Sequence, residues 1–269
     1  STPPPPTPAT YESLVAEADS APTEGWDFSW FEGRATEARP SWGYAVSLAR
    51  RLDEVGTEAA LDLDTGGGEV LDFALGRAAN PPRTLAATEA WTPNAAKATR
   101  LLGPRGVVVV RTAADGAQLP FADAAFDLVS SRHPVRPAWG EIARVLRPGG
   151  TYFAQHVGHR SAFELVEEFL GPLPENTDRH PEAESAAAKD AGLEVVDLRV
   201  ERLRMEFHDI GAVVHFLRKV VWMVPGFTSA RYETELRALH RRITAEGPFV
   251  AHSTRHLIEA RRPLGAVSE

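Results

Sequence analysis

A short apolar run followed by three consecutive glycines is the feature that most restricts the fold of this 269-residue chain. Residues 59–63 are apolar except for Asp62, glycines occupy positions 66–68, and a helical pattern begins at Glu69. Glycine permits backbone conformations and close approaches that a side chain would block. The order of strand, glycine loop and helix is typical of nucleotide-binding α/β proteins.

Strand-like and helix-like patterns then alternate along the chain. Strands are predicted at 59–63, 84–88, 106–112, 126–130, 151–157, 193–207 and within 249–261. Helical patterns separate most of them, and two further helices at about 208–247 form an insertion before the last strand. This alternation predicts a Rossmann-like α/β fold, in which a mostly parallel sheet carries helices on both faces. The four valines at 107–110 predict a strand that is covered on both faces.

Composition divides the chain into three parts. Residues 1–24 are rich in Pro, Thr and Ala, which predicts a flexible arm. Residues 25–56 are dense in aromatic side chains and contain one predicted helix. Residues 57–269 carry the alternating pattern and therefore form the main domain.

Charge and residue content exclude several classes of function. The formal net charge of −8 argues against broad nucleic-acid binding, which needs a basic surface. The absence of cysteine excludes disulfides and thiolate metal sites, and the nine histidines show no zinc-type spacing, so no metal is predicted. No signal peptide and no apolar run of about 20 residues is found, so we expect a cytoplasmic protein without a membrane segment.

Acidic residues follow three of the predicted strands, at the sheet edge where ligands bind in open parallel sheets. Asp62 and Asp64 end the first strand, Glu89 ends the second, and Asp115 follows the third. Carboxylate oxygens accept hydrogen bonds from a ribose diol, whereas a phosphate loop would need a Gly-Lys-Ser/Thr sequence that is absent here. The pattern therefore predicts a site for a nucleoside.

Five motifs in order resemble those of the class I S-adenosylmethionine-dependent methyltransferases, in particular the small-molecule subgroup called type 11. They lie at 61–68, 88–89, 114–121, 125–129 and 141–150, within a resemblance that covers about residues 40–160. The resemblance implies a seven-stranded sheet with an antiparallel last strand, S-adenosylmethionine as cofactor and methyl transfer to a small molecule by in-line displacement. It also implies a substrate lid built from residues 25–56 and the insertion at about 208–247.

The resemblance further implies cofactor-binding roles for residues at the strand ends. Gly66 and Gly68 would present backbone amides to the methionine part, Glu89 would bind the ribose, and Asp115 would accept from the adenine amino group. The implied cofactor-binding residues are Asp62, Asp64, Gly66, Gly67, Gly68, Glu89, Ala90, Asp115, Gly116 and Arg132.

Two histidines after the fourth and fifth strands are predicted to be catalytic. The residues after these strands face the transferred methyl group in this fold, which places His133 first and His156 second. A base assists methyl transfer to a hydroxyl or an acidic carbon. A purely structural role for either histidine remains open. Trp26 and Trp30 can serve in packing or in recognition, and if they cover the pocket we expect an aromatic or apolar acceptor. A homodimer is the assembly considered.

Asp64 departs from the family pattern, which has glycine at this position. Aspartate tolerates a left-handed backbone better than most residues, so the turn can survive the replacement. Its charge near the carboxylate of a bound cofactor would weaken binding unless it turned outward or paired with a cation. Two alternatives stay open: a methyltransferase-fold protein that transfers no methyl group, and a nicotinamide-dependent dehydrogenase, which the later motifs disfavour.

Overall fold

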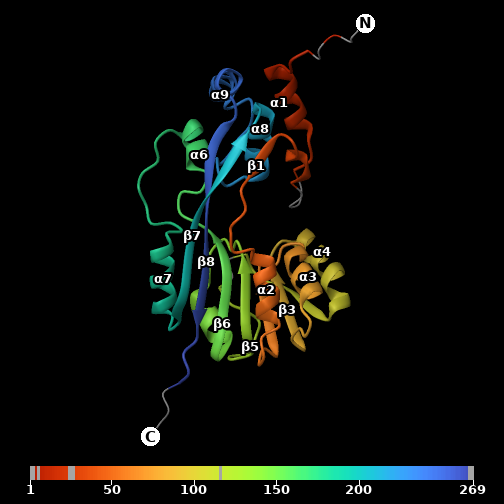
Figure 1. Ribbon diagram of the computed structural model, residues 1–269, viewed down its shortest axis with the longest axis vertical. Helices are drawn as coiled ribbons and strands as arrows, with labels where there is room; N and C mark the ends of the chain where they lie inside the picture. Colours follow the sequence, from red (N-terminus) through yellow and green to blue (C-terminus); the bar gives the residue numbers. More distant parts are fainter. Residues whose placement is uncertain (1–3, 5–6, 24–27, 115–116, 266–269) are drawn as a thin grey trace. The chain divides into compact units, whose positions relative to one another are not determined.

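The computed structural model describes residues 4, 7–23, 28–114 and 117–265 (Figure 1). Its helices are α1 (Tyr11–Ser20), α2 (Tyr44–Leu52), α3 (Glu69–Arg77), α4 (Thr92–Leu102), α5 (Trp139–Val145), α6 (Phe163–Leu170), α7 (Pro181–Asp190), α8 (Ile210–Lys219) and α9 (Glu233–Glu246). Short 3₁₀ turns occupy Ser29–Phe31 and Gly103–Arg105. The strands are β1 (Ala35–Glu37), β2 (Ala59–Leu63), β3 (Thr84–Glu89), β4 (Val107–Arg111), β5 (Phe126–Arg132), β6 (Leu146–Val157), β7 (Glu194–Phe207) and β8 (Phe249–Arg261).

The chain divides into two compact units. Unit 1 contains residues 1–38, 162–176 and 203–253, and unit 2 contains residues 39–161, 177–202 and 254–269. The strands pair in the order β1-β7-β8-β6-β5-β2-β3-β4. Within unit 2, β6, β5, β2, β3 and β4 are parallel, while β8 runs antiparallel to β6. The predicted α/β class and the antiparallel last strand are therefore confirmed.

Strand β2 lies at the point where the direction of the chain through the sheet reverses. It pairs with β3, the next strand in sequence, on one side and with β5 on the other. In open α/β sheets such a switch point leaves a crevice outside the carboxyl ends of the strands, where ligands bind. The glycine loop after β2 follows this point directly.

Alternation along the strands sends successive side chains of unit 2 to opposite faces of the sheet. Phe153 and Leu257 pack with α2, α3 and α4 on one face. Tyr152 and Ile258 pack with α5 and α7 on the other. Helices α2, α3, α4 and α7 are labelled in Figure 1, and the two clusters show that both faces of this part of the sheet are covered, as predicted.

Unit 1 has a core of its own. Helices α1, α6, α8 and α9 bury apolar side chains against one another and against β7 and β8, with Phe207, Ile210 and Leu236 almost fully buried. Strand β1 pairs antiparallel with the end of β7, which brings Ala35 opposite Phe207. With this short strand the sheet has eight strands, one more than the resemblance implies.

The prediction of a flexible arm over residues 1–24 is wrong for residues 11–20. Residues 11–20 form α1, where Thr10 and Ser13 make a reciprocal capping box and Tyr11, Val15 and Ala18 are buried. These three side chains recur at helical spacing, so the sequence pattern itself could have predicted this helix. The proposed division at residue 56 also differs from the structure, because residues 39–56, including α2, belong to unit 2.

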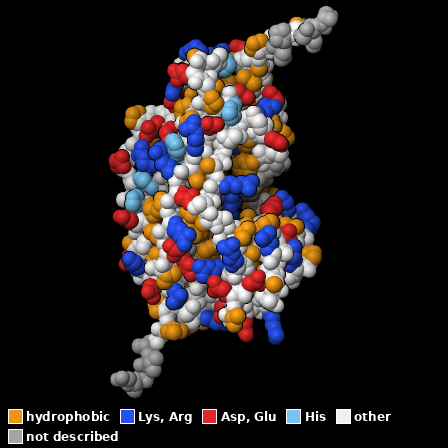
Figure 2. Space-filling model, in the orientation of Figure 1, with side chains coloured by type: hydrophobic (Ala, Val, Ile, Leu, Met, Phe, Trp, Pro, Cys, Tyr) orange, Lys and Arg blue, Asp and Glu red, His pale blue; other side chains and the backbone are white. Residues whose placement is uncertain are grey.

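The four valines at 107–110 do form a strand, but it is not covered on both faces. Strand β4 is the last in the sheet order, and Val108 is 63% exposed. Acidic and basic side chains are interspersed on the surface that Figure 2 shows, as expected for a chain without a basic domain. None of the helices in the described ranges is long and apolar enough to cross a membrane.

Candidate active site

The carboxyl ends of β2 and β5 are joined by buried side chains at the switch point. Asp62 accepts a hydrogen bond from the Ser130 hydroxyl at 2.7 Å and another from the Thr65 hydroxyl at 2.7 Å. The Ser131 hydroxyl donates to the carbonyl of Leu63 at 3.0 Å. These bonds fix the entry of the loop. They also hold Asp62 in place, because both of its carboxylate oxygens are engaged.

The loop that follows β2 has the left-handed backbone that its glycines allow. Gly66 and Gly68 have φ values of 64° and 87°. A Cβ atom at Gly68 would lie 2.9 Å from the Leu102 side chain, so the close packing of the loop on α4 also requires glycine there. Asp64 has φ 52°, which confirms that aspartate can take the conformation usually assigned to glycine. Its amide donates to the Thr88 hydroxyl at 3.2 Å.

Three carboxylates, those of Asp62, Asp64 and Glu89, lie at this edge of unit 2. Burial raises the pKa of Asp62 to about 6, and the neighbouring charge of Asp64 adds to the increase. Burial also raises the pKa of Asp64 itself. The pKa of Glu89 is raised by burial and by Asp64, although hydrogen bonding from Ala90 and Asn94 opposes the increase. Each carboxylate is therefore easier to ionise when a cation or new hydrogen-bond donors reach this edge.

This edge has the donor and acceptor chemistry that S-adenosylmethionine requires. The cofactor carries a sulfonium and an ammonium, both cationic, together with a ribose diol that donates hydrogen bonds. Glu89 ends β3 beside the glycine loop, where a carboxylate can accept from a diol. The residues that we expect at the adenine ring, Asp115 and Gly116, lie outside the described residues. Trp26, expected at the acceptor, also lies outside them. Asp62, Asp64 and Glu89 supply carboxylates of the kind that these cationic and diol groups require, and their binding of the cofactor stays a prediction.

His133 lies just after β5, as predicted, and its imidazole is held by a buried glutamine that we did not predict. The side-chain amide of Gln155 contacts Nε2 of His133 at 2.8 Å. The other end of that amide, Oε1, is 2.7 Å from the indole nitrogen of Trp42. An indole N–H can only donate, so Oε1 must be the acceptor and the Gln155 nitrogen must donate to His133. Nε2 of His133 is then an acceptor, and the proton of the neutral ring sits on Nδ1.

The environment keeps His133 neutral. Burial lowers its pKa well below the usual value, and the positive charges of Arg132 and Arg255 act in the same direction. The only basic lone pair of the neutral ring is already bound to Gln155. His133 is therefore placed to donate a hydrogen bond from Nδ1, and a role as general base would first require it to leave Gln155.

His156 lies on the opposite face of β6 from Gln155 and does not join His133. It is 2% exposed, its Nε2 lies 2.9 Å from the Tyr152 hydroxyl, and its Nδ1 lies 2.6 Å from the Glu184 carboxylate. Both ring nitrogens are thus engaged inside the layer of α5 and α7. Alternation of side chains along a strand could have separated residues 155 and 156 from the sequence alone.

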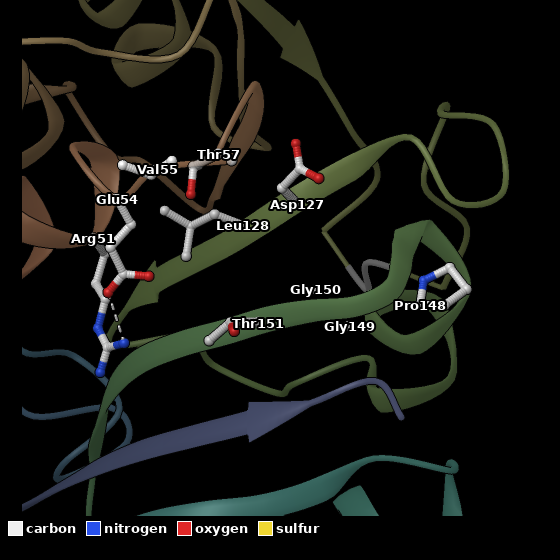
Figure 3. A pocket seen from close by; sticks show the side chains of 11 residues that line it. Arg51, Glu54, Val55, Thr57, Asp127, Leu128, Pro148, Gly149, Gly150 and Thr151 are labelled. Carbon is white, nitrogen blue, oxygen red and sulfur yellow. Dashed lines mark hydrogen bonds and ion pairs between the residues drawn. The ribbon is translucent and has the colours of Figure 1, made fainter. Parts of the chain in front are cut away.

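The acid in the motif at 125–129, Asp127, has a structural role. Asp127 accepts from the amides of Glu58 and Ala59 at 2.9 and 3.0 Å and forms an ion pair with Arg147 at 2.9 Å. It also lines a pocket of about 220 Å³ with Arg51, Glu54 and the turn that contains Gly149 (Figure 3). This pocket lies at the amino ends of β2 and β5, the edge opposite the glycine loop. It is therefore not the candidate active site.

Unit 1 contains an apolar pocket of about 350 Å³. Its walls are mostly aromatic and aliphatic and include two glutamates. They comprise Phe28, Phe31, Glu32, Ala35, Thr36, Glu37, Met205, Phe207 and Phe216. Ligand pockets of small molecules begin at about this size and are lined in this way. Residues from both segments predicted as a lid, 25–56 and 208–247, contribute to these walls. Their action as a lid remains a prediction.

Comparisons with known proteins agree with the geometry of unit 2. The family described as a methyltransferase domain matches residues 61–154. A demethylmenaquinone methyltransferase of Thermus thermophilus is 31% identical, over 55% of this chain and 80% of its own length. The fold is similar to that of a Bacillus halodurans protein provisionally described as a methyltransferase, with a TM-score of 0.57, 19% identity, and 81% and 98% of the two chains covered. The YcgJ protein of Bacillus subtilis has a TM-score of 0.55, with 15% identity and 82% and 99% coverage.

Proposed function

Since the chain belongs to the class I S-adenosylmethionine-dependent methyltransferases, we propose that it methylates an apolar small molecule and that the described strand-end residues bind the cofactor. The observation that carries the site assignment is the group of three carboxylates with raised pKa values beside the glycine loop. When bound, the cofactor supplies a methyl group on a sulfonium that is already activated for displacement. The protein therefore has mainly to position the acceptor and exclude water.

Each strand-end residue has a distinct part in this proposal. Asp62, fixed by Ser130 and Thr65, attracts the cationic ammonium and sulfonium of the cofactor and holds the loop. Glu89 accepts hydrogen bonds from the ribose. Gly66 carries no side chain that would cover its amide, whereas the amide of Gly68 donates to the carbonyl of Thr65 at 3.1 Å and holds the turn.

His133 acts on the acceptor in this proposal. A neutral imidazole that donates from Nδ1 suits an acceptor with a carbonyl or an ionised oxygen, and it stabilises negative charge on that oxygen. The Thermus thermophilus relative is named for a quinone substrate, which is an acceptor of this kind.

Calorimetric titration with S-adenosylmethionine and S-adenosylhomocysteine tests the cofactor site. We expect one binding site per chain and at least roughly tenfold weaker binding in Glu89→Gln, since a hydrogen bond to a charged group contributes about 1.5–3 kcal/mol. Asp72→Asn is the matched control, because Asp72 lies on α3 and pairs with Arg105 instead of facing the strand ends. Unchanged affinity in Glu89→Gln would remove this residue from the site.

A further inference from the structure

A second cluster of ionisable side chains lies on the sheet face that carries α5 and α7, and methyl transfer makes no use of it. His156 of β6 and His256 of β8 are direct partners in the antiparallel register, with ring centroids 5.0 Å apart. Glu184 projects onto this pair from the first turn of α7. Three elements that are distant in sequence thus bring two imidazoles and one carboxylate together.

Both imidazoles converge on a single oxygen atom. Oε2 of Glu184 accepts from Nδ1 of His156 at 2.6 Å and also from Nε2 of His256. His156 and His256 are 2% and 0% exposed, and the rings of Trp139 and Tyr152 cover His156. Among the described residues, Nδ1 of His256 is buried without a hydrogen-bond partner.

The ligand types in this cluster are those that a divalent metal ion takes. One carboxylate oxygen and two imidazole nitrogens meet within hydrogen-bond distance, and both histidines are buried. Metal ligands of these kinds are an ionised carboxylate and neutral imidazoles, states that both residue types reach near neutral pH.

We propose that Nδ1 of His156, the carboxylate of Glu184 and Nε2 of His256 form a binding site for one Zn²⁺ ion. The three ligand atoms lie within 4.8 Å of one another. Tetrahedral zinc with bonds of about 2.0–2.2 Å needs its ligand atoms about 3.3 Å apart, so the N···O contacts have to open by less than about 1 Å. Two nitrogens and one oxygen without sulfur suit zinc and related divalent transition metals.

Ligation requires one tautomer of each neutral imidazole. In His156 the proton passes from Nδ1 to Nε2, where it donates to the Tyr152 hydroxyl oxygen. In His256 it passes from Nε2 to Nδ1, the nitrogen that has no partner among the described residues. Three protein ligands leave a fourth position for water. The ion would connect α7 to β6 and β8 in unit 2.

Zinc titration of tag-free, chelator-treated protein tests this site. We expect one Zn²⁺ per chain by calorimetry and by elemental analysis after gel filtration, and a higher unfolding temperature with zinc present. Glu184→Gln and His256→Phe should each weaken binding at least roughly 100-fold, since even residues that only support a ligand change affinity by about 10- to 100-fold. His252→Phe is the control, because His252 pairs with the carboxylate of Glu164 in unit 1, outside the cluster.

Binding of Co²⁺ to the wild-type chain tests the proposed zinc site even if a ligand variant fails to fold. One equivalent of Co²⁺ bound to the wild-type chain should give the intense visible absorption of a tetrahedral nitrogen and oxygen site, and Zn²⁺ should abolish it. The proposal is overturned if wild-type protein binds neither ion stoichiometrically, or if binding persists in well-folded Glu184→Gln and His256→Phe. The cluster would then be a hydrogen-bonded connection between α7 and the sheet.

Discussion

Replacing Gln155 with glutamate should place a proton on Nε2 of His133 and favour the positively charged ring. In the wild-type chain the Gln155 amide donates to Nε2, which fixes the proton of the neutral ring on Nδ1. A carboxylate at position 155 can still accept from the Trp42 indole, but it can no longer donate to His133. Nε2 of His133 must then carry a proton, and the positively charged ring becomes the favoured state.

The size of the effect follows from the 2.8 Å contact between the two side chains. Opposite unit charges at that distance attract by about 6 kcal/mol at an effective dielectric of about 20, before the desolvation of the new carboxylate is subtracted. Nearby opposite charges in proteins raise a histidine pKa by about 1–3 pH units. The wild-type pKa lies well below 6.5, so Gln155→Glu should bring it to the usual range or above.

Long-range ¹H–¹⁵N NMR of the imidazole rings measures both the tautomer and the titration. Wild-type His133 should show the Nδ1–H tautomer and stay neutral well below pH 6.5, whereas Gln155→Glu should show protonated Nε2. Gln155→Leu removes the donor without adding charge and should give an intermediate pKa. A wild-type ring with its proton on Nε2, or one that titrates near 6.5, would refute the assigned hydrogen-bond directions.

Two further predictions concern the glycine loop. Gly68→Ala should lower the free energy of unfolding, measured by urea titration, by about 2–3 kcal/mol, because φ 87° disfavours a side chain and the new Cβ meets Leu102 at 2.9 Å. Gly103→Ala is the control: its Cβ would lie in open space, so the free energy of unfolding should change by less than about 0.5 kcal/mol. Asp64→Gly should leave cofactor affinity within about threefold of wild type and move the pKa of Asp62 below about 6 in a carboxyl ¹³C titration, since it removes a neighbouring charge. A large gain in affinity would instead favour a protein that has lost methyl transfer.

The part of the site that could be predicted from sequence is the part formed by consecutive residues. The loop after β2 and the acid that ends β3 follow from local order along the chain, because parallel strands place their carboxyl ends at one edge. Gln155 could not be identified in this way, since its role depends on contacts with Trp42 and His133, 113 and 22 residues away. Only the alternation of β6 pointed to a difference between residues 155 and 156.

The cluster of His156, Glu184 and His256 could be predicted from the sequence even less than Gln155. Zinc motifs are found in sequences because their ligands repeat at short spacing on one turn or helix. Here the ligand-type residues lie at 156, 184 and 256, and the register between β6 and β8 brings the two histidines together. Such a register is set by packing along both strands, so no spacing rule applied to one segment can reveal it.

Two effects of Asp64 can be distinguished in the structure: its backbone conformation and the charge of its carboxylate. Its φ of 52° shows that the turn needs a left-handed residue and does not strictly need glycine. Its carboxylate instead acts on its neighbours, because it adds to the raised pKa values of Asp62 and Glu89. A ligand whose cationic groups approach all three carboxylates relieves this repulsion, whereas a phosphate would increase it. In the proposed site, Asp64 therefore adds a preference for a cationic ligand over a phosphate, within the limit of the roughly threefold change in cofactor affinity expected for Asp64→Gly.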